Sequence, residues 1–179
     1  DAVFSLSLPF AFPFYDGSYS TVYIDTHGRI GFAPMDSDYA VNETKFSEQE
    51  LIAVMWNDYG EYGELIDLFV ESAADRVTIR WQLDTLLNVS ATLQNDGRIV
   101  LRYGLGNARG GIIGISAGNG QSSLLSPRSN AGGVGEVDDV IFTPATSLFS
   151  VSIPLEPDTA TNRISAAIQS VPSGMEIYL

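Results

Sequence analysis

Apolar residues recur at every second position along most of this sequence, and this period limits what the chain can fold into. In residues 76–83, Val77, Ile79 and Trp81 alternate with polar residues. That spacing places apolar side chains on one face of an extended strand and polar side chains on the other. Alternating segments recur at spacings of about 8 to 12 residues with turn residues between them. The pattern predicts an all-β fold, a two-sheet antiparallel sandwich of jelly-roll-like type with long polar loops.

The same alternation, bounded by Gly, Asn, Asp or Ser, predicts further strands. They cover residues 20–25, 29–32, 65–71, 88–94, 98–103, 112–115 and 139–143. Phe10, Phe12 and Phe14 alternate as well, but Pro9 and Pro13 interrupt them. Because proline has no amide hydrogen for a ladder, we expect this stretch at a sheet edge or in a bulge.

The segments between the strands carry turn and loop residues. Asn95-Asp96-Gly97 joins two alternating runs, and Asp-Gly suits the positive φ of a tight hairpin turn. Residues 34–50 are polar and irregular, with a short helical turn predicted from Ser47 to Glu50 before the apolar run 51–56. Residues 118–135 are rich in Gly, Ser and Asn, which predicts a long exposed loop.

A chain of 179 residues fits one large domain, which we place at residues 1–143, followed by an extension at 144–179. The extension carries alternating Phe149, Val151 and Ile153. It either completes the sandwich or donates a strand to a neighbouring subunit, and residues 2–8 are a second candidate for donation. Strand addition of this kind gains affinity from backbone hydrogen bonds.

Charge and composition argue against several classes of function. Asp and Glu total 22 against 9 Lys and Arg, so the net charge is −13, and cysteine is absent. A negative field repels phosphate backbones, so nucleic-acid binding is not expected. No run reaches the roughly 20 apolar residues of a membrane helix, so we expect no membrane insertion. The lack of cysteine excludes a thiolate nucleophile and a cysteine zinc site.

Five segments occur in an order that is typical of one protein family. They are FPFYDGSYSTVYIDTHGRIGF (12–32), LIAVMWNDY (51–59), RVTIRWQL (76–83), ATLQNDGRIVLRYG (91–104) and GIIGISAGNG (111–120). Together, over roughly residues 8–143, they resemble the domain of nidogen-like and plexin-domain-containing extracellular proteins, which is also common in bacterial surface proteins and adhesins. Val54, Met55 and Asn57 depart from the family's Pro, Phe and Asp at those positions.

The resemblance implies an extracellular, non-catalytic module and carries over no ligand-binding residues. The residues themselves also argue against an enzyme. His27 is the single histidine and precedes Gly28 in a predicted turn, where we expect it to be solvated. A Ser-His-Asp triad would have to use it. The carboxylates that follow the Trp56 run lie in predicted loops, whereas a glycosidase pair must share a partly buried cleft.

Calcium suits these carboxylates better, because it takes six to eight oxygen ligands from loops. The candidate calcium ligands are Asn57, Asp58, Glu61 and Glu64, and no other cofactor is expected. Their spacing does not match an EF-hand.

Aromatic residues supply the candidate ligand contacts. Trp56 and Trp81 lie in apolar patterns and are predicted to be core residues. Tyr39, Tyr59 and Tyr62 lie in predicted loops and are the better candidates for contacts with a partner. Glycosylation sequons begin at Asn42 and Asn88.

Three functions remain open from the sequence. The first is a non-catalytic extracellular module of the adhesin type that contacts surface proteins or glycans. The second is a subunit of a surface filament or layer that binds copies of itself by strand exchange. The third is an accessory domain of a secreted hydrolase.

Overall fold

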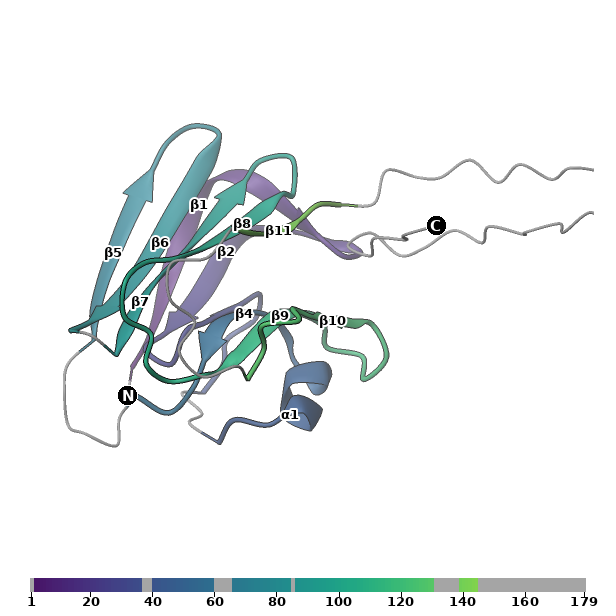
Figure 1. Ribbon diagram of the computed structural model, residues 1–179. Coiled ribbons are helices and arrows are strands. Elements are labelled where there is room, and N and C mark those ends of the chain that lie inside the picture. The colour runs from purple at the N-terminus through teal and green to yellow at the C-terminus, as the bar shows by residue number, and fades with distance from the viewer. Residues whose placement is uncertain (1, 37–39, 60–65, 85, 131–138, 145–179) are drawn as a thin grey trace, which may run out of the picture.

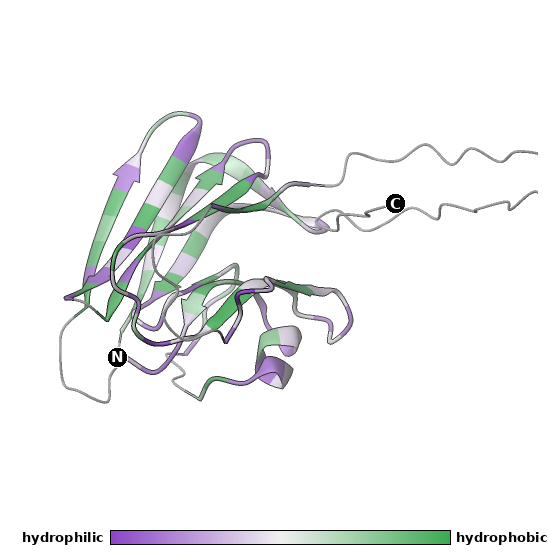
Figure 2. Ribbon diagram, in the orientation of Figure 1, coloured by the Kyte–Doolittle hydropathy of each residue, from purple (hydrophilic) through white to green (hydrophobic). Residues whose placement is uncertain are grey.

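Two antiparallel β-sheets pack face to face in the computed structural model, which describes residues 2–36, 40–59, 66–84, 86–130 and 139–144 (Figure 1). This arrangement confirms the all-β, two-sheet sandwich that the alternation predicts. Figure 2 shows the same alternation of hydropathy along the strands. The main core is made of apolar residues from both sheets.

The first sheet has six strands in the order β1-β2-β3-β4-β9-β10. The strands are β1 (Val3–Phe14), β2 (Gly17–Asp25), β3 (Arg29–Gly31), β4 (Glu50–Trp56), β9 (Ile112–Ala117) and β10 (Ser123–Leu125). β1 lies at the edge, and its register with β2 shifts between Ser7 and Phe12. The edge position and the bulge confirm what Pro9 and Pro13 predict.

The second sheet has five strands in the order β11-β8-β7-β6-β5. They are β11 (Val140–Phe142), β8 (Ile99–Tyr103), β7 (Leu87–Gln94), β6 (Arg76–Leu83) and β5 (Asp67–Ser72). The turn between β7 and β8 is the predicted one: Gly97 has a φ of 88° and donates its N–H to the Gln94 carbonyl over 2.9 Å.

Two buried side chains fix how the sheets face each other. The Trp81 indole on β6 donates to the Asp25 carbonyl at the end of β2 over 2.7 Å, and the Tyr103 hydroxyl on β8 donates to the Val54 carbonyl on β4 over 2.8 Å. β2 therefore lies opposite β6, and β4 lies opposite β8. It follows that the edge strands β1 and β5 lie on the same side of the sandwich (Figure 1).

The main core lies between the sheets, and a second, smaller core lies outside the first sheet. Trp81 belongs to the main core, and both tryptophans are fully buried, as predicted. The smaller core contains Phe46, Leu51, Ala53, Trp56 and Ile112. Its Phe46 comes from the short helix α1 (Glu43–Glu48), which packs against β4 and β9. β4 is therefore buried on both faces, which explains why residues 51–56 are apolar without alternation.

The helical turn predicted at 47–50 is in the wrong place. The helix starts at Glu43 because the Asn42 side chain caps it, accepting the Lys45 N–H over 2.8 Å, and because the buried Phe46 anchors it. Gln49 already has extended backbone dihedrals, and β4 begins at the next residue.

One further expectation about strands is corrected, and the expectations about strand donation stay predictions. The predicted loop 118–135 contains β10, which pairs with β9 from Ser123 to Leu125, and its residues 131–138 lie outside the described residues. Residues 3–7 pair with β2 of the same chain, and their donation to a neighbouring subunit stays a prediction. Residues 145–179 lie outside the described residues, and the role of the 144–179 extension stays a prediction.

Candidate functional site

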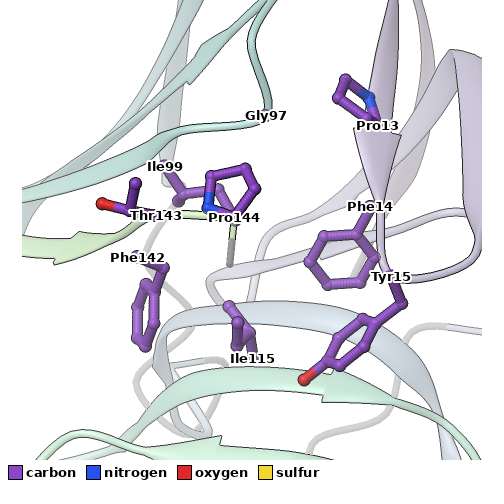
Figure 3. A pocket seen from close by; sticks show the side chains of 9 residues that line it. All are labelled: Pro13, Phe14, Tyr15, Gly97, Ile99, Ile115, Phe142, Thr143 and Pro144. Carbon is purple, nitrogen blue, oxygen red and sulfur yellow. The ribbon is translucent and has the colours of Figure 1, made fainter. Parts of the chain in front are cut away.

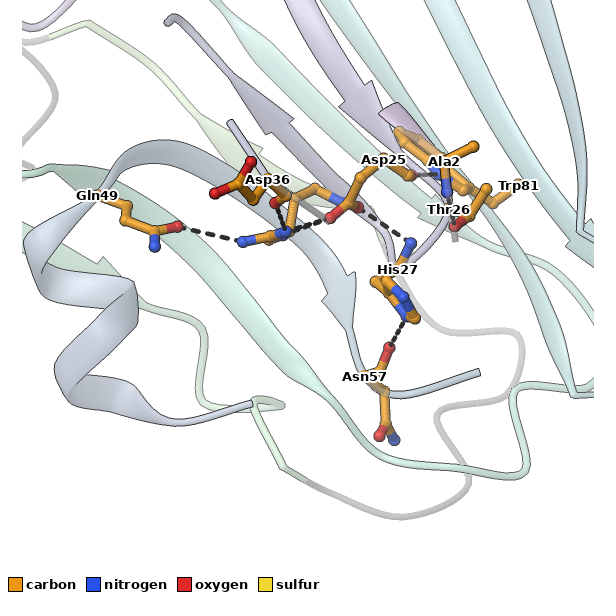
Figure 4. A network of polar contacts seen from close by, with 9 residues as sticks. Ala2, Asp25, Thr26, His27, Asp36, Gln49, Asn57 and Trp81 are labelled. Atoms are coloured by element: carbon orange, nitrogen blue, oxygen red, sulfur yellow. Dashed lines mark hydrogen bonds and ion pairs between the residues drawn. The ribbon is translucent and has the colours of Figure 1, made fainter. Parts of the chain in front are cut away.

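A buried ion pair organises the turn from β2 into β3 (Figure 4). The Asp25 carboxylate accepts the backbone N–H groups of His27 and Arg29 over 3.0 and 2.9 Å. Its second oxygen lies 2.6 Å from Nε and 2.5 Å from Nη2 of the Arg29 side chain. Burial raises the pKa of the Asp25 carboxyl, and the Arg29 guanidinium and hydrogen bonds oppose that rise.

The remaining contacts of Arg29 tie distant segments to this turn. Nη1 donates to the Gln49 side chain over 3.1 Å, and Nη2 donates to the Asp36 carbonyl over 2.9 Å. The guanidinium also lies 4.7 Å from the centre of the Trp56 ring, a cation–π distance. All the neighbours named are protein groups that fix a loop, so the network is structural.

His27 is buried, with 1% of its surface exposed, and the expectation that it is solvated is wrong. Its Nδ1 lies 3.1 Å from the Asn57 carbonyl, and its own carbonyl accepts the Asn57 N–H over 3.2 Å (Figure 4). The Asp25 carboxylate bonds the His27 backbone, whereas in a triad the carboxylate bonds the imidazole ring. The burial depends on a segment 30 residues away, so no local signal in the sequence indicates it.

The candidate contact residues do not come together on the described surface. Tyr59 is 1% exposed, and its hydroxyl donates to the Met55 carbonyl over 2.9 Å, so the expectation that it contacts a partner from a surface loop is wrong. Burial raises its pKa. Tyr39 and Tyr62 lie outside the described residues.

Of the candidate calcium ligands, the structure describes Asn57 and Asp58, whereas Glu61 and Glu64 lie outside the described residues. The Asn57 amide donates to the Gly110 carbonyl, and its oxygen accepts the Asp58 N–H over 2.7 Å. Among the described residues, no three His, Asp or Glu side chains are grouped so that they could hold a metal ion. Calcium binding at this loop stays a prediction.

Two hollows lined by described residues lack the features of a ligand site. The first is an apolar cavity of about 40 Å³ at one end of the sandwich (Figure 3). Its lining residues are Pro13, Phe14, Tyr15, Gly97, Ile99, Ile115, Phe142, Thr143 and Pro144. Pockets for small molecules measure roughly 300 Å³ or more, so this cavity is a packing gap.

The second hollow, of about 480 Å³, lies beside the Asp25–Arg29 pair. Asp36 and Gln49 line it, and both already bond Arg29. Glu50 lines it too and accepts the Tyr19 hydroxyl over 2.7 Å. These lining groups are therefore engaged with the protein itself.

Exposed apolar side chains mark the edge strand β5. Phe69 is 51% exposed and Val70 is 47% exposed, on successive residues of a strand that pairs only with β6 in the described structure. Sequence reasoning missed this surface, because alternation identifies strands but does not show which strand lies at an edge. In the parts of the chain that the structure describes, no helix is long and apolar enough to cross a membrane.

The fold agrees with the comparison with known families. A family model described as NIDO related matches residues 1–147, which is most of the chain and includes all five motifs. Neither the curated proteins nor the solved structures contain a match. Nidogen-like domains are extracellular and generally structural, without catalytic activity. The chain therefore belongs to the NIDO-related family, as a nidogen-like β-sandwich domain.

Proposed function

We propose that this domain is a non-catalytic extracellular module of the adhesion type that binds a partner protein along the edge of β5 that is unpaired among the described residues. The observation that carries the proposal is the exposed pair Phe69 and Val70 on this edge. Edge strands present unpaired backbone N–H and C=O groups, and an extended segment of a partner can pair with them.

The other three edges suit strand addition less well. β10 and β11 are three residues long, and β1 is interrupted by a bulge and by Pro9 and Pro13. β5 has six residues in register with β6 and no proline. Natural proteins protect sheet edges with short strands, bulges and prolines, and β5 lacks these features.

The charges on β5 indicate what kind of partner strand fits. Asp67 and Glu71 lie on the same face as Phe69, one on each side of it. Opposite charges in directly facing positions stabilise a strand pair, and like charges destabilise it. A partner strand with apolar residues at its centre and Lys or Arg on both sides is therefore favoured.

The same charges argue against β5 pairing with a second copy. An antiparallel pair centred on Phe69 brings Asp67 of each chain opposite Glu71 of the other, and each chain has a net charge of −13. Filament formation by strand exchange is thus the weaker alternative for this edge. Light scattering of the purified chain, with calcium and with chelator, tests it: growth of particles with concentration would favour self-assembly.

Binding of a designed peptide tests the β5 proposal. The probe is a synthetic ten-residue peptide with the central segment Lys-Thr-Val-Thr-Lys, which places Lys, Val and Lys on one face of the strand, opposite Asp67, Phe69 and Glu71. Fluorescence anisotropy measures the binding of this Val–Lys peptide. We expect binding together with slower hydrogen exchange of the β5 amides. The same peptide with proline in place of one central residue should bind more weakly, because it cannot complete the ladder.

Two matched variants locate the binding site. Phe69→Lys places a cation on β5, where the basic probe must pair, and Phe4→Lys places the same charge on β1 at an equally exposed position, 52% against 51%. Weaker binding to the Phe69 variant alone supports the proposal. Equal effects of the two substitutions, or equal binding of the proline peptide, would contradict it.

A further inference from the structure

Four arginines lie together on the outer face of the second sheet. Val77, Ile79, Ile99 and Leu101 point into the core, so their neighbours in the sequence point outward. Those outward positions include Arg76 and Arg80 on β6, Arg98 directly before β8, and Arg102 on β8. Arg76, Arg80 and Arg102 are exposed, and Arg98 is partly exposed.

The register of the sheet arranges these arginines in two rows. Arg80, Ser90 and Arg102 are direct neighbours across β6, β7 and β8. Arg76 pairs with Gln94, whose N–H donates to the Arg98 carbonyl over 3.0 Å. The arginines of one row are about 10 Å apart across two strand spacings, and the rows are about 14 Å apart along the strands.

This face differs in charge from the rest of the chain. The strands β6, β7 and β8, with Arg98, carry four of the 9 basic residues and none of the 22 acidic residues. The remainder therefore holds 9 − 4 = 5 basic residues against 22 acidic ones. These strands therefore form a local cationic face, although the net charge of the chain is −13.

Acidic residues lie at the border of the face. Asp75 is 3.4 Å from Arg76, and Asp139 is 3.1 Å from Arg102. Asp67 and Glu71 lie on the neighbouring edge strand, and Asp96 accepts the Arg98 backbone N–H. Both ion pairs are exposed, and such pairs contribute little free energy, so an anionic ligand can replace them.

The row of residues between the two arginine rows is recessed. Thr78, Thr92 and Val100 form the row between the arginines, and the hydroxyl groups of Thr78 and Thr92 lie 2.9 Å apart. Thr92 and Val100 are nearly buried, at 4% and 3% exposure, so the arginines extend beyond this row. Phe69 pairs with Arg80, so its exposed ring extends the row formed by Arg80, Ser90 and Arg102.

We propose that this arginine face, defined by Arg76, Arg80, Arg98 and Arg102, binds an acidic polysaccharide that carries spaced carboxylates. Guanidinium groups form two parallel hydrogen bonds with a carboxylate, which gives geometric selectivity as well as attraction. The partly exposed side chains of Thr78, Ser90 and Gln94 between them offer donors and acceptors to sugar hydroxyls. The Phe69 ring offers an apolar surface at the end of a row. A sugar ring can pack against this surface, whereas the backbone of an acidic peptide gains nothing from it.

The overall charge restricts the ligand to a single thin chain. A duplex nucleic acid or an extended anionic membrane would also face the acidic border and the remaining body of the protein, which repel it. A polysaccharide chain laid across the strands contacts the central face alone. The inference shares Phe69 with the β5 proposal, but it is carried by the four arginines, which the β5 proposal does not use.

Binding of oligogalacturonate, a purely carboxylated sugar chain, tests the inference. Calorimetry or biolayer interferometry at low salt compares the native chain with Arg80→Gln/Arg102→Gln. A matched variant, Lys45→Gln/Arg128→Gln, removes two charges away from the arginine face and gives the same net charge. We expect the face variant to lose roughly tenfold or more in affinity, since two charge-assisted contacts are removed, and the matched variant to change little.

Three results would overturn the inference. They are no binding of oligogalacturonate by the native chain, equal losses in the two double variants, and equal binding of polyglutamate, which would indicate general anion attraction. Dextran, a neutral glucan, should not bind. Thermal unfolding checks that the exposed Arg variants remain folded, and retained binding of the Val–Lys peptide shows that the β5 edge is unaffected.

Discussion

The turn between β2 and β3 depends on two charged residues that have no contact with bulk water. Asp25 and Arg29 are both fully buried, and the pair is completed by two backbone N–H groups, a glutamine side chain and a backbone carbonyl. Leaving one buried charge without its partner costs far more free energy than the intact pair contributes to stability. The two residues are therefore expected to depend on each other.

Replacing Arg29 with Met tests this dependence. The substitution leaves the Asp25 carboxylate buried without its cation, so we expect the free energy of unfolding to fall by about 3–5 kcal/mol. Urea unfolding at neutral pH measures the change. The double variant Asp25→Asn/Arg29→Met removes both charges and should be more stable than Arg29→Met alone. If the double variant is no more stable than the single one, the uncompensated charge is not the cause.

At the residue scale, the sequence predicts burial where a repeating pattern exists and fails where burial depends on distant contacts. Trp81 alternates with apolar neighbours, and its burial could be predicted. His27 and Tyr59 lie beside turns, and their burial comes from segments packed over them. Asp25 and Arg29, four residues apart across a turn, did offer a signal for an ion pair.

At the element scale, the β7–β8 hairpin depends on the positive φ of Gly97 and on a close contact. A Cβ added to Gly97 would lie 2.7 Å from Pro144 and 2.9 Å from Pro13. Gly120 has a similar φ of 71°, but a Cβ added there would meet no atom within 4 Å. Comparing Gly97 with Gly120 separates the free-energy cost of a side chain at positive φ from the cost of a steric clash.

We expect Gly97→Ala to destabilise the domain more than Gly120→Ala. Both variants carry the cost of a positive φ, about 1 kcal/mol, and Gly97→Ala adds the displacement of the two prolines. The midpoint of thermal unfolding measures both. Equal midpoints would show that the two proline rings move without cost, and that this end of the sandwich is loosely packed.

The strands themselves were predictable because each one has an inward and an outward face. β6 has the bounds that the alternation predicts, and β7 and β8 differ from the predicted strands by one residue at their starts. β10 was missed because three residues in a segment rich in Ser and Gly become a strand only through pairing with β9. The arginine face could have been found by aligning the predicted hairpins, since Arg76, Arg80, Arg98 and Arg102 all occupy polar positions of neighbouring strands.

At the scale of the whole molecule, net charge describes the long-range field but not each surface. The net charge of −13 reflects the excess of acidic residues in the chain. It does not reveal a sheet face that bears only basic charges on its three central strands. Nidogen-like sandwiches offer two broad faces and several edges. In this chain the β5 edge and the arginine face differ in chemistry, which is why we propose a different partner for each.

Four tyrosines connect the stability of the whole sandwich to alkaline pH. Burial raises the pKa of Tyr15 and Tyr19 to about 12, with Glu50 adding to both shifts. Burial also raises the pKa of Tyr59 and Tyr103, which lie between the sheets and bond backbone carbonyls. The tyrosine hydroxyl in an unfolded chain ionises near its ordinary pKa of about 10.

The sign of the pH dependence follows from these shifts. Because the folded-state pKa values are raised, the unfolded chain releases protons first, and stability must fall as the pH rises above about 10. Below that pH the contribution is fully present. We expect the urea midpoint to be constant up to about pH 9 and then to decrease, with tyrosinate absorbance appearing together with unfolding.

Tyr103→Phe supplies the control for this prediction. It loses the 2.8 Å hydrogen bond to Val54, so it should be less stable at neutral pH, by about 1 kcal/mol. With one buried hydroxyl fewer, its stability should decline less steeply above about pH 10. If the native protein ionises its tyrosines near their ordinary pKa without losing stability, these hydroxyls are not held in the packed interface between the sheets. The cross-sheet bonds that set β4 opposite β8 would then contribute little to holding the sandwich together.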